Sequence, residues 1–321
     1  MKKVFAFWAV VLAAVMLMCA CSTSTPAKVR VAALKGPTGI GMAQLMDQAK
    51  QNKTQGKYEF TVAAAPDEVV SAVASGSVDI AAVPVNLAAS LYAKTEGKVK
   101  LAAVNTLGVL YILENGDSVH SVADLKGKTL YATGQGSTPE YVLNAILEKN
   151  GLKVGEDVVI EYKAEHDELA TLAASGEVTL AMLPEPNVTA AMAKNENLRI
   201  ALDLTQQWES LELGTLVQGC IVVRDGFLQE NPQAVQTFLT EYAASVDYVN
   251  GDPAAAGELV ASAGIMPQAA LATKAIPNCN IVCIQGDEMK AMASSTLQVL
   301  FDANPKSVGG AMPDDGFYYL P

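Results

Sequence analysis

The sequence contains few basic residues, few histidines and no long apolar run beyond its N-terminal segment. Its 22 Lys and Arg stand against 34 Asp and Glu, which gives a net charge of −12 with both histidines neutral. Because no basic stripe is present to neutralise phosphates, we expect no nucleic-acid partner. After residue 21 the chain has no stretch that is long and apolar enough to cross a membrane.

The short glycine motifs do not match those of catalytic loops. "GQGST" at 134–138 lacks the G-x-S-x-G order of a nucleophile elbow, and "GPTGIG" at 36–41 lacks the G-x-G-x-x-G spacing. A Walker lysine and an H-E-x-x-H pair are also missing. His166 and Asp167 in "AEHDEL" are adjacent, and adjacent positions on a helix do not face a common ion. We therefore expect no catalytic residue, no cofactor and no metal site.

Three cysteines, Cys220, Cys279 and Cys283, follow the N-terminal segment. An odd number does not build a disulfide framework. If residues 279–283 are extended, the Cα atoms of Cys279 and Cys283 lie roughly 13 Å apart, which is too far for a disulfide bond. Cys220 could pair with either of the other two, but free buried thiols are the simpler expectation.

The first 20 residues have the composition of a secretory signal. Lys2 and Lys3 precede an uncharged run of 16 residues from Phe5 to Ala20, shorter than a membrane span. The end of the run, "MCAC", resembles a bacterial lipobox with Met18 in the usual position of leucine. The resemblance implies a signal at 1–20, a lipidated Cys21 on the extracytoplasmic face of the cell membrane, and a tether at 21–27. The alternative is an ordinary secretory signal with incidental cysteines.

An internal repeat organises the rest of the chain. Residues 67–94 and 167–194 align without a gap, and ten of the 28 positions are identical. In each copy an Asp (Asp67 or Asp167) is expected to cap a helix, Ser-Gly ends it, and an apolar strand follows that stops at a proline. Chance similarity between alanine-rich helices is the alternative explanation.

Each copy is preceded by a strand, a glycine loop and a helix, at 29–50 and at 128–149. Strands that alternate with helices predict an α/β fold with mostly parallel sheets covered on both faces. Two such units predict two lobes. We expect lobe 1 at 28–107 and 222–321, lobe 2 at 108–221, and two hinge strands between them within 99–119 and 213–228.

The chain resembles the type II substrate-binding proteins of ABC importers, in the group that binds sulfonates, taurine, nitrate and thiamine precursors. The resemblance rests on "SGSVDIAAVP", "SVADLKGKTLYATGQGSTPEYVL", "NPQAVQTFLTEYAASVDYVNGDP" and the tail "NPKSVGGAMPDDGFYYLP". It implies two lobes that close over a small molecule, with a permease and an ATPase as partners. A monomer attached to the membrane only through its lipid is expected.

The expected binding site lies where glycine loops and helix N-termini of the two lobes meet. In open α/β sheets ligands bind beyond the carboxyl ends of strands, and helix N-termini present free N–H groups there. The candidate ligand-binding residues are Gly36, Pro37, Thr38, Gly39, Asn86, Asn105, Gly134, Gln135, Gly136, Ser137, Thr138, Glu185, Asn187 and Trp208. Thr106 and Gln218 are weaker candidates. Bulky or acidic substitutions at Gly39 or Gly136 are expected to abolish binding and leave the fold intact.

Two of these residues have alternative interpretations. Glu185, between Pro184 and Pro186, suits a cationic or amide-bearing part of a ligand, or else is a solvated loop charge. Trp208 could form an aromatic wall over the ligand, or else have a surface or packing role. The scarcity of arginine near the loops favours a small monoanion, zwitterion or polar heterocycle as ligand. Two functional alternatives stay open: a bilobed enzyme of the menaquinone-synthesis type, and a ligand-sensing surface lipoprotein.

Overall fold

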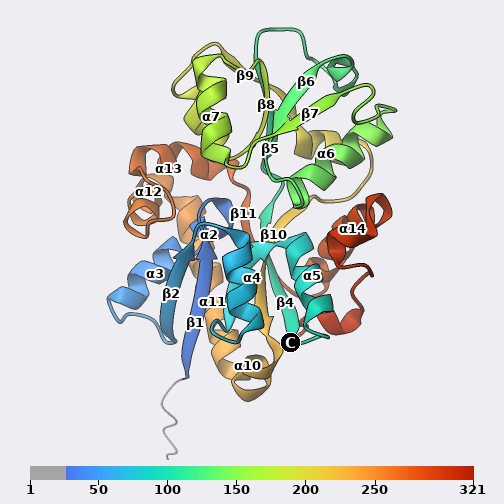
Figure 1. The fold of residues 1–321 in the computed structure, drawn as a ribbon. Helices are drawn as coiled ribbons and strands as arrows, with labels where there is room; N and C mark the ends of the chain where they lie inside the picture. Colours follow the sequence, from blue (N-terminus) through green and yellow to red (C-terminus); the bar gives the residue numbers. More distant parts are fainter. Residues whose placement is uncertain (1–26) are drawn as a thin grey trace, which may run out of the picture.

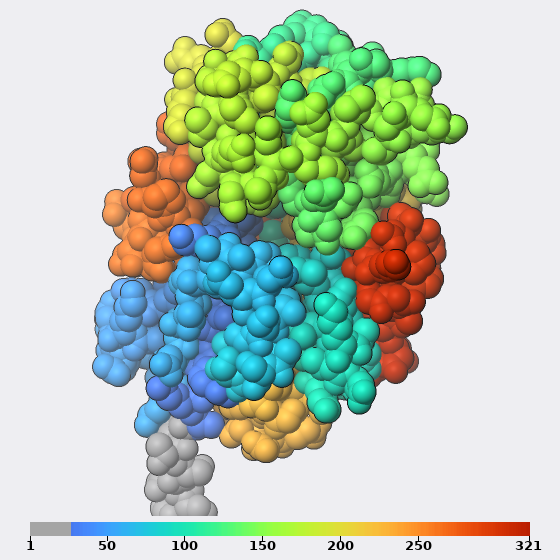
Figure 2. Space-filling view, viewed as in Figure 1, coloured from blue at the N-terminus to red at the C-terminus, as the bar shows by residue number. Residues whose placement is uncertain are grey.

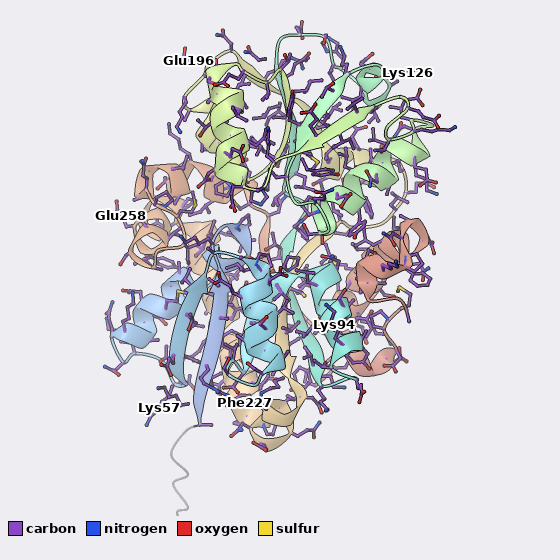
Figure 3. The ribbon with its side chains drawn as sticks, in the orientation of Figure 1. Lys57, Lys94, Lys126, Glu196, Phe227 and Glu258 are labelled. Atoms are coloured by element: carbon purple, nitrogen blue, oxygen red, sulfur yellow. The ribbon has the colours of Figure 1, made fainter. Side chains whose placement is uncertain are left out.

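The computed structural model describes residues 27–321, which form two α/β lobes stacked one above the other (Figure 1). The expected signal at 1–20, the lipidated Cys21 and nearly all of the tether lie outside the described residues. The labelled side chains Lys126 and Glu196 mark the outer part of lobe 2, and Lys57 and Phe227 mark the outer end of lobe 1 (Figure 3). No helix among residues 27–321 has the length and apolar character of a membrane span.

Lobe 1 is built on a six-stranded sheet in the order β11-β4-β10-β3-β1-β2. Its strands are β1 (Lys28–Leu34), β2 (Lys57–Ala63), β3 (Ile80–Pro84), β4 (Val99–Leu107), β10 (Val217–Arg224) and β11 (Ile281–Ile284). Its helices are α2 (Pro37–Ile40), α3 (Ala43–Lys50), α4 (Pro66–Ala74), α5 (Val85–Lys94), α10 (Asp225–Glu230), α11 (Pro232–Gly251), α12 (Pro253–Ser262), α13 (Ala269–Ala275) and α14 (Gly286–Ala303). Short 3₁₀ turns are η2 (Ile276–Asn278), η3 (Pro305–Val308) and η4 (Asp315–Phe317).

Lobe 2 is built on a five-stranded sheet in the order β7-β6-β8-β5-β9. Its strands are β5 (Leu110–Asn115), β6 (Thr129–Ala132), β7 (Val159–Tyr162), β8 (Leu180–Pro184) and β9 (Leu198–Asp203). The turn η1 (Val122–Leu125) and the helices α6 (Thr138–Lys149), α7 (His166–Ser175), α8 (Asn187–Met192) and α9 (Leu204–Ser210) complete it. The predicted two-lobed α/β architecture is therefore confirmed.

The sheets are mixed: most strands of each sheet run in one direction, as predicted, but β10 and β11 in lobe 1 and β5 in lobe 2 run against them. β1 pairs in parallel with β2 and β3, and β6 pairs in parallel with β7 and β8. β10 is antiparallel to both β3 and β4, and β5 is antiparallel to both β8 and β9. The physical reason is the double crossing, since β5 and β10 carry the chain away from the other lobe while their neighbours run toward it.

The second crossing lies earlier in the chain than expected. β10 pairs with β3 and β4 along its length, so residues 217–221 belong to the sheet of lobe 1 and the expected boundary at 221/222 falls inside a strand. The chain therefore crosses at 211–216, between α9 and β10. The first crossing is at Gly108 and Val109, between β4 and β5. A Cβ at Gly108 would lie 2.1 Å from Thr205 Oγ1, so α9 packs directly against this crossing.

The repeat forms the same elements in both lobes, but its two acidic residues do not cap the helices. Gly76 and Gly176 follow α4 and α7 with φ of 76° and 80°, as the left-handed turn after a helix requires. The N-caps are Ala65 and Glu165, and Asp67 and Asp167 lie within the first turns. The predicted caps were wrong because α4 begins at Pro66 and α7 at His166, before Asp67 and Asp167, so both acidic residues are already inside the helices.

A single apolar cluster joins the two lobes through the crossing. It includes Val104 and Val217 of the first sheet, Leu110 and Ile112 of β5, and Trp208 of α9. Two further clusters, one in each lobe, lie on the other faces of the sheets. The lobes are thus separate layered bodies whose shared core is confined to the hinge side.

A buried carboxylate holds three strands of lobe 1 together at the end remote from lobe 2. Asp79 is 1% exposed and accepts hydrogen bonds from the guanidinium groups of Arg30 in β1 and Arg224 in β10, at 2.6–2.8 Å. Burial alone would raise the pKa of Asp79, but the bonds from the two arginines outweigh it and hold that pKa below its usual value.

We expect Asp79→Ala to lower the free energy of unfolding by about 2–4 kcal/mol, because both arginines lose their carboxylate partner. Urea unfolding at neutral pH measures this change. Since the folded pKa is lowered, the contribution is present above the ordinary carboxyl pKa and is lost as the pH falls through the lowered value. Glu59→Ala, which breaks the exposed pair with Lys28, is the control and should have no measurable effect. Equal midpoints for both variants would contradict this account.

Candidate ligand-binding site

The carboxyl ends of β1 and β3 in lobe 1 face those of β6 and β8 in lobe 2, and we call the boundary between these ends the seam. Asn86 follows β3 and Thr138 begins α6; both are buried, and Thr138 Oγ1 donates a 2.8 Å hydrogen bond to Asn86 Oδ1. Asn86 Nδ2 donates in turn to the carbonyl of Ser307 at 3.3 Å. Figure 2 shows the two lobes in contact across the seam on the viewed face. Two candidates from different lobes therefore bond directly.

The glycine loop of lobe 1 closes on itself and on β4. Gly36 has a φ of 91°, and its carbonyl accepts bonds from the N–H groups of Gly39 and Ile40 at 3.1 and 3.2 Å. The Thr38 carbonyl accepts a 3.0 Å bond from Nδ2 of Asn105, a fully buried residue of β4. Pro37 begins α2, which is only four residues long. The loop is thus held rigidly at the end of β1 with Thr38 against Asn105.

Part of the corresponding loop in lobe 2 is already hydrogen-bonded internally. Gly134 and Gly136 have φ of 79° and 77°, values that favour glycine. The N–H of Gly136 donates to the Glu140 carboxylate at 2.6 Å, and Ser137 Oγ donates to the carbonyl of Gly134 at 2.8 Å. A carboxylate of the protein therefore occupies one of the N–H groups expected to meet an anionic ligand. Gln135, at the tip of the loop, is exposed.

Glu185 is a buried carboxylate, and its interpretation as a solvated loop charge was wrong. It begins the turn after β8, is 1% exposed, and accepts bonds from the N–H and the hydroxyl of Thr189 at 3.1 and 2.9 Å. The side chain of Asn278 in lobe 1 also acts to lower its pKa. Burial raises the pKa of Glu185 above its usual value, although Thr189 and Asn278 oppose the shift.

The other two candidates of lobe 2 have partners within that lobe. Asn187 begins α8 and is 8% exposed, and its Nδ2 donates to Asp167 Oδ1 at 2.8 Å. Trp208 is fully buried in the apolar cluster that joins the lobes. Its ring therefore packs in the core near the crossing instead of forming an exposed wall.

A histidine that the sequence interpretation considered only as a metal ligand lies beside these residues. His166 begins α7, and its Nδ1 is 2.6 Å from Oγ1 of Thr133, the residue that follows β6. The side chain is reached by solvent, yet desolvation lowers its pKa and outweighs the attraction of Asp167 and Glu165. The sequence offered one signal that could have identified His166 as a site candidate. It begins the helix that follows β7, a strand that ends at the seam.

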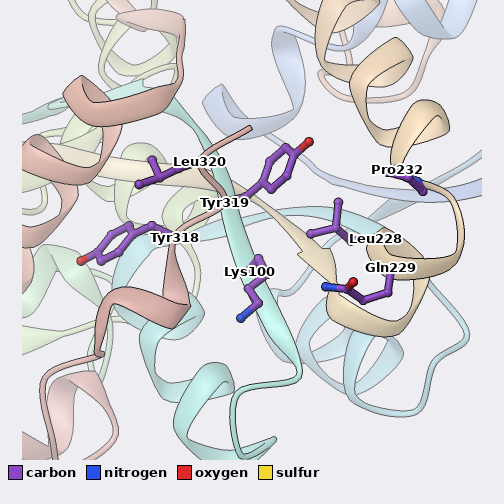
Figure 4. Close-up of a pocket in the computed structure, with 7 residues that line it drawn as sticks. All are labelled: Lys100, Leu228, Gln229, Pro232, Tyr318, Tyr319 and Leu320. Atoms are coloured by element: carbon purple, nitrogen blue, oxygen red, sulfur yellow. The ribbon is translucent and has the colours of Figure 1, made fainter.

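Two surface hollows lie elsewhere in the protein. The first, of about 300 Å³, is formed where the C-terminal tail crosses β4 beside α10, and Figure 4 shows Lys100, Tyr319 and Leu228 around it. The second, of about 430 Å³, lies between α3 and the edge strand β2. Neither includes a candidate residue. Among the described residues no group of three His, Cys, Asp or Glu is arranged to hold a metal ion, and Cys220, Cys279 and Cys283 are free.

Comparison with known proteins agrees with the two-lobed fold. A family model described as NMT1/THI5 like matches residues 58–256. The structure is similar to an ABC transporter protein from Parabacteroides distasonis, with 27% identity, a TM-score of 0.76, and coverage of 91% of this chain and 98% of the other.

It is also similar to the periplasmic aliphatic sulphonate binding protein SsuA from Escherichia coli, with 18% identity, a TM-score of 0.74, and coverage of 92% and 93%. The alkanesulfonate-binding SsuA of Xanthomonas axonopodis bound to MOPS has 18% identity, a TM-score of 0.67, and coverage of 91% and 96%. At these identities the two SsuA structures establish the shared fold alone. No curated protein matches the sequence.

The rigid loop of lobe 1 generates a prediction that corrects the expectation for Gly39. A Cβ at this buried glycine would lie 1.9 Å from the carbonyl oxygen of Leu34, so Gly39→Ala displaces backbone and should cost about 1–3 kcal/mol of stability. Thermal unfolding measures the loss. Gly251→Ala, at the end of α11 with open space around its Cβ, is the matched control and should not destabilise. A Gly39→Ala protein as stable as the wild type would refute the close approach.

Proposed function

Since this chain belongs to the NMT1/THI5-like family, we propose that it is an extracytoplasmic solute-binding protein of an ABC importer. It captures a small polar molecule at the seam between its lobes and delivers it to the permease. The observation that carries the proposal is the meeting of Asn86 and Thr138 across the seam, where the carboxyl ends of strands from both sheets converge. The similarity to transport proteins over nearly the whole described chain supports it.

The proposed ligand-binding residues line the two sides of the seam. From lobe 1 they are Gly36, Pro37, Thr38, Gly39, Asn86 and Asn105, and from lobe 2 they are Gly134, Gln135, Gly136, Ser137, Thr138, Glu185 and Asn187. Amide and hydroxyl groups dominate this set, which suits a small polar or singly charged solute. Trp208 is left out of the contact set because it packs in the core.

Closure of the two lobes is the proposed mechanism. The lobes turn about the crossings at Gly108 and at 211–216, and the ligand stabilises the closed arrangement by bonding to both sides. Lipidation of Cys21 would hold the protein at the membrane beside the permease and its ATPase. The absence of covalent chemistry in this mechanism distinguishes it from the enzyme alternative, because a bound ligand is recovered unchanged.

Small-angle scattering tests this function. A thermal-shift screen with sulfonates, carboxylates, amino-acid derivatives and pyrimidines first identifies a ligand, because binding to the native state raises the melting temperature. We expect a larger radius of gyration without ligand than the structure implies, and a decrease to the value of the structure at saturation. An envelope that does not change, or a ligand that is chemically converted, would refute the proposed function.

The bond across the seam gives a second expectation. Thr138→Val keeps the shape of the side chain, removes the donor and leaves Asn86 Oδ1 unpaired, so ligand affinity should fall about tenfold, or about 1.4 kcal/mol. Isothermal titration calorimetry measures the affinity. Thr240→Val, on an exposed position of α11 remote from the seam, is the matched control and should leave affinity unchanged. Wild-type affinity in Thr138→Val would exclude a role for this bond in closure.

A further inference from the structure

Glu185 is placed where the end of β8 meets lobe 1. α13 of lobe 1 contacts α8, which follows Glu185, and Asn278 of the adjoining η2 acts to lower the pKa of Glu185. The N–H of Glu185 itself donates to the carbonyl of Val109 in the first crossing at 2.9 Å. The carboxylate therefore lies on the hinge side of the seam, between groups of both lobes. Figure 1 shows α12 and α13 of lobe 1 reaching up to lobe 2 beside α7.

This carboxylate has no cationic partner in the described chain. Among residues 27–321, no nitrogen of Lys, Arg or His lies within 4.0 Å of it, whereas the other buried carboxylates, Asp79 and Glu114, each bond an arginine. Burial of an ionised carboxylate without a counter-charge costs several kcal/mol, so such groups are normally paired or protonated. Glu185 is thus an uncompensated acidic group at a position where a ligand is expected.

The surroundings of Glu185 are suited to a positively charged group. Its charge contributes to the raised pKa values of Tyr111 in β5 and of Cys279 after η2. A carboxylate accepts strong charge-assisted hydrogen bonds from an ammonium or amidinium group. In the glycine loop of the same lobe, the Glu140 carboxylate already occupies the Gly136 N–H, which disfavours a second anion at that loop.

We propose that the solute carries an ammonium or amidinium group and that Glu185 binds it. This inference rests on the proposed function and deepens it by naming the charge class of the ligand. If Glu185 is protonated in the unliganded protein, the cationic group takes the place of that proton. If Glu185 is ionised, the cationic group supplies the counter-charge that the protein does not. A helix cap for α8 is the alternative role, but it requires no charge: a glutamine accepts from the Thr189 N–H through Oε1 and donates from Nε2 to the Thr189 hydroxyl.

Matched ligand pairs test the proposal on the full mature protein. The pairs are taurine with isethionate, 4-aminobutyrate with 4-hydroxybutyrate, and putrescine with 1,4-butanediol. In each pair a hydroxyl takes the place of every amine. They are screened by thermal shift within a wider set of small primary amines, amidines and their hydroxyl analogues, and hits are titrated by calorimetry. We expect only amine or amidine members to raise the melting temperature and to bind.

The variant Glu185→Gln removes the charge, keeps one acceptor for the Thr189 N–H and turns the other position into a donor that the Thr189 hydroxyl can accept. It should lower the affinity for the amine ligand at least tenfold and abolish the preference over the hydroxyl analogue, while the unliganded melting temperature changes little. Glu258→Gln removes a charge from the exposed face of α12 and should leave affinity and preference unchanged.

Three results would overturn the proposal, and they differ in what they imply for the solute-binding function. If only sulfonates or carboxylates without an amine bind, Glu185 does not select a cation and the solute-binding function still stands. If amine ligands bind but Glu185→Gln keeps the preference, the carboxylate serves only as a cap of α8. If no member of the set binds, the inference fails, and the proposed function is decided separately by the scattering experiment on a ligand from the first screen.

Discussion

The direction in which strands meet the seam is the constraint on which the two-lobed arrangement depends. β1 and β3 run toward lobe 2, and β6 and β8 run toward lobe 1, so their carboxyl ends and the helix starts that follow them are brought face to face. This is possible only because β5 and β10 run the other way and carry the chain across twice. The antiparallel strands are therefore what places two similar half-sites opposite one another.

The sequence predicted the parts of this architecture that depend on local chemistry. Glycines at 76 and 176 end helices, prolines at 84 and 184 end strands, and the ungapped match between copies reflects these shared requirements. Strand direction was predicted less well, because an apolar β-branched run has the same pattern in a parallel and an antiparallel neighbour. The boundary at 221/222 was misplaced for the same reason, since the pattern of β10 does not reveal which sheet it joins.

The loops proposed to form the site were predicted in position more than in bonding. Loops after β1, β3, β6 and β8 follow from the fold, and Asn86 and Thr138 do meet. The partners of individual side chains could not be derived, because they depend on the rotation of elements far apart in sequence. Ser137-Thr-Pro-Glu140 has the spacing of a capping box, so the turn of the Glu140 carboxylate back toward Gly136 had a signal that the prediction did not use. Trp208 was placed near the ligand although its helix packs against the crossing.

The hinge is completed by residues from late in the chain, and this bears on how the protein reaches its native state. Asn280 Nδ2 donates to the carbonyl of Gly108 at 2.6 Å, and the backbone carbonyl of Asn280 accepts from the N–H of Leu107 at 3.1 Å. Lobe 2 is one continuous stretch of chain, whereas the sheet of lobe 1 lacks two of its strands until β10 and β11 have emerged. A chain that emerges from its N-terminus during synthesis can therefore complete its second lobe while its first is still unfinished, with the edge of β3 unpaired. Until β10 arrives, that edge is open to pairing with other strands.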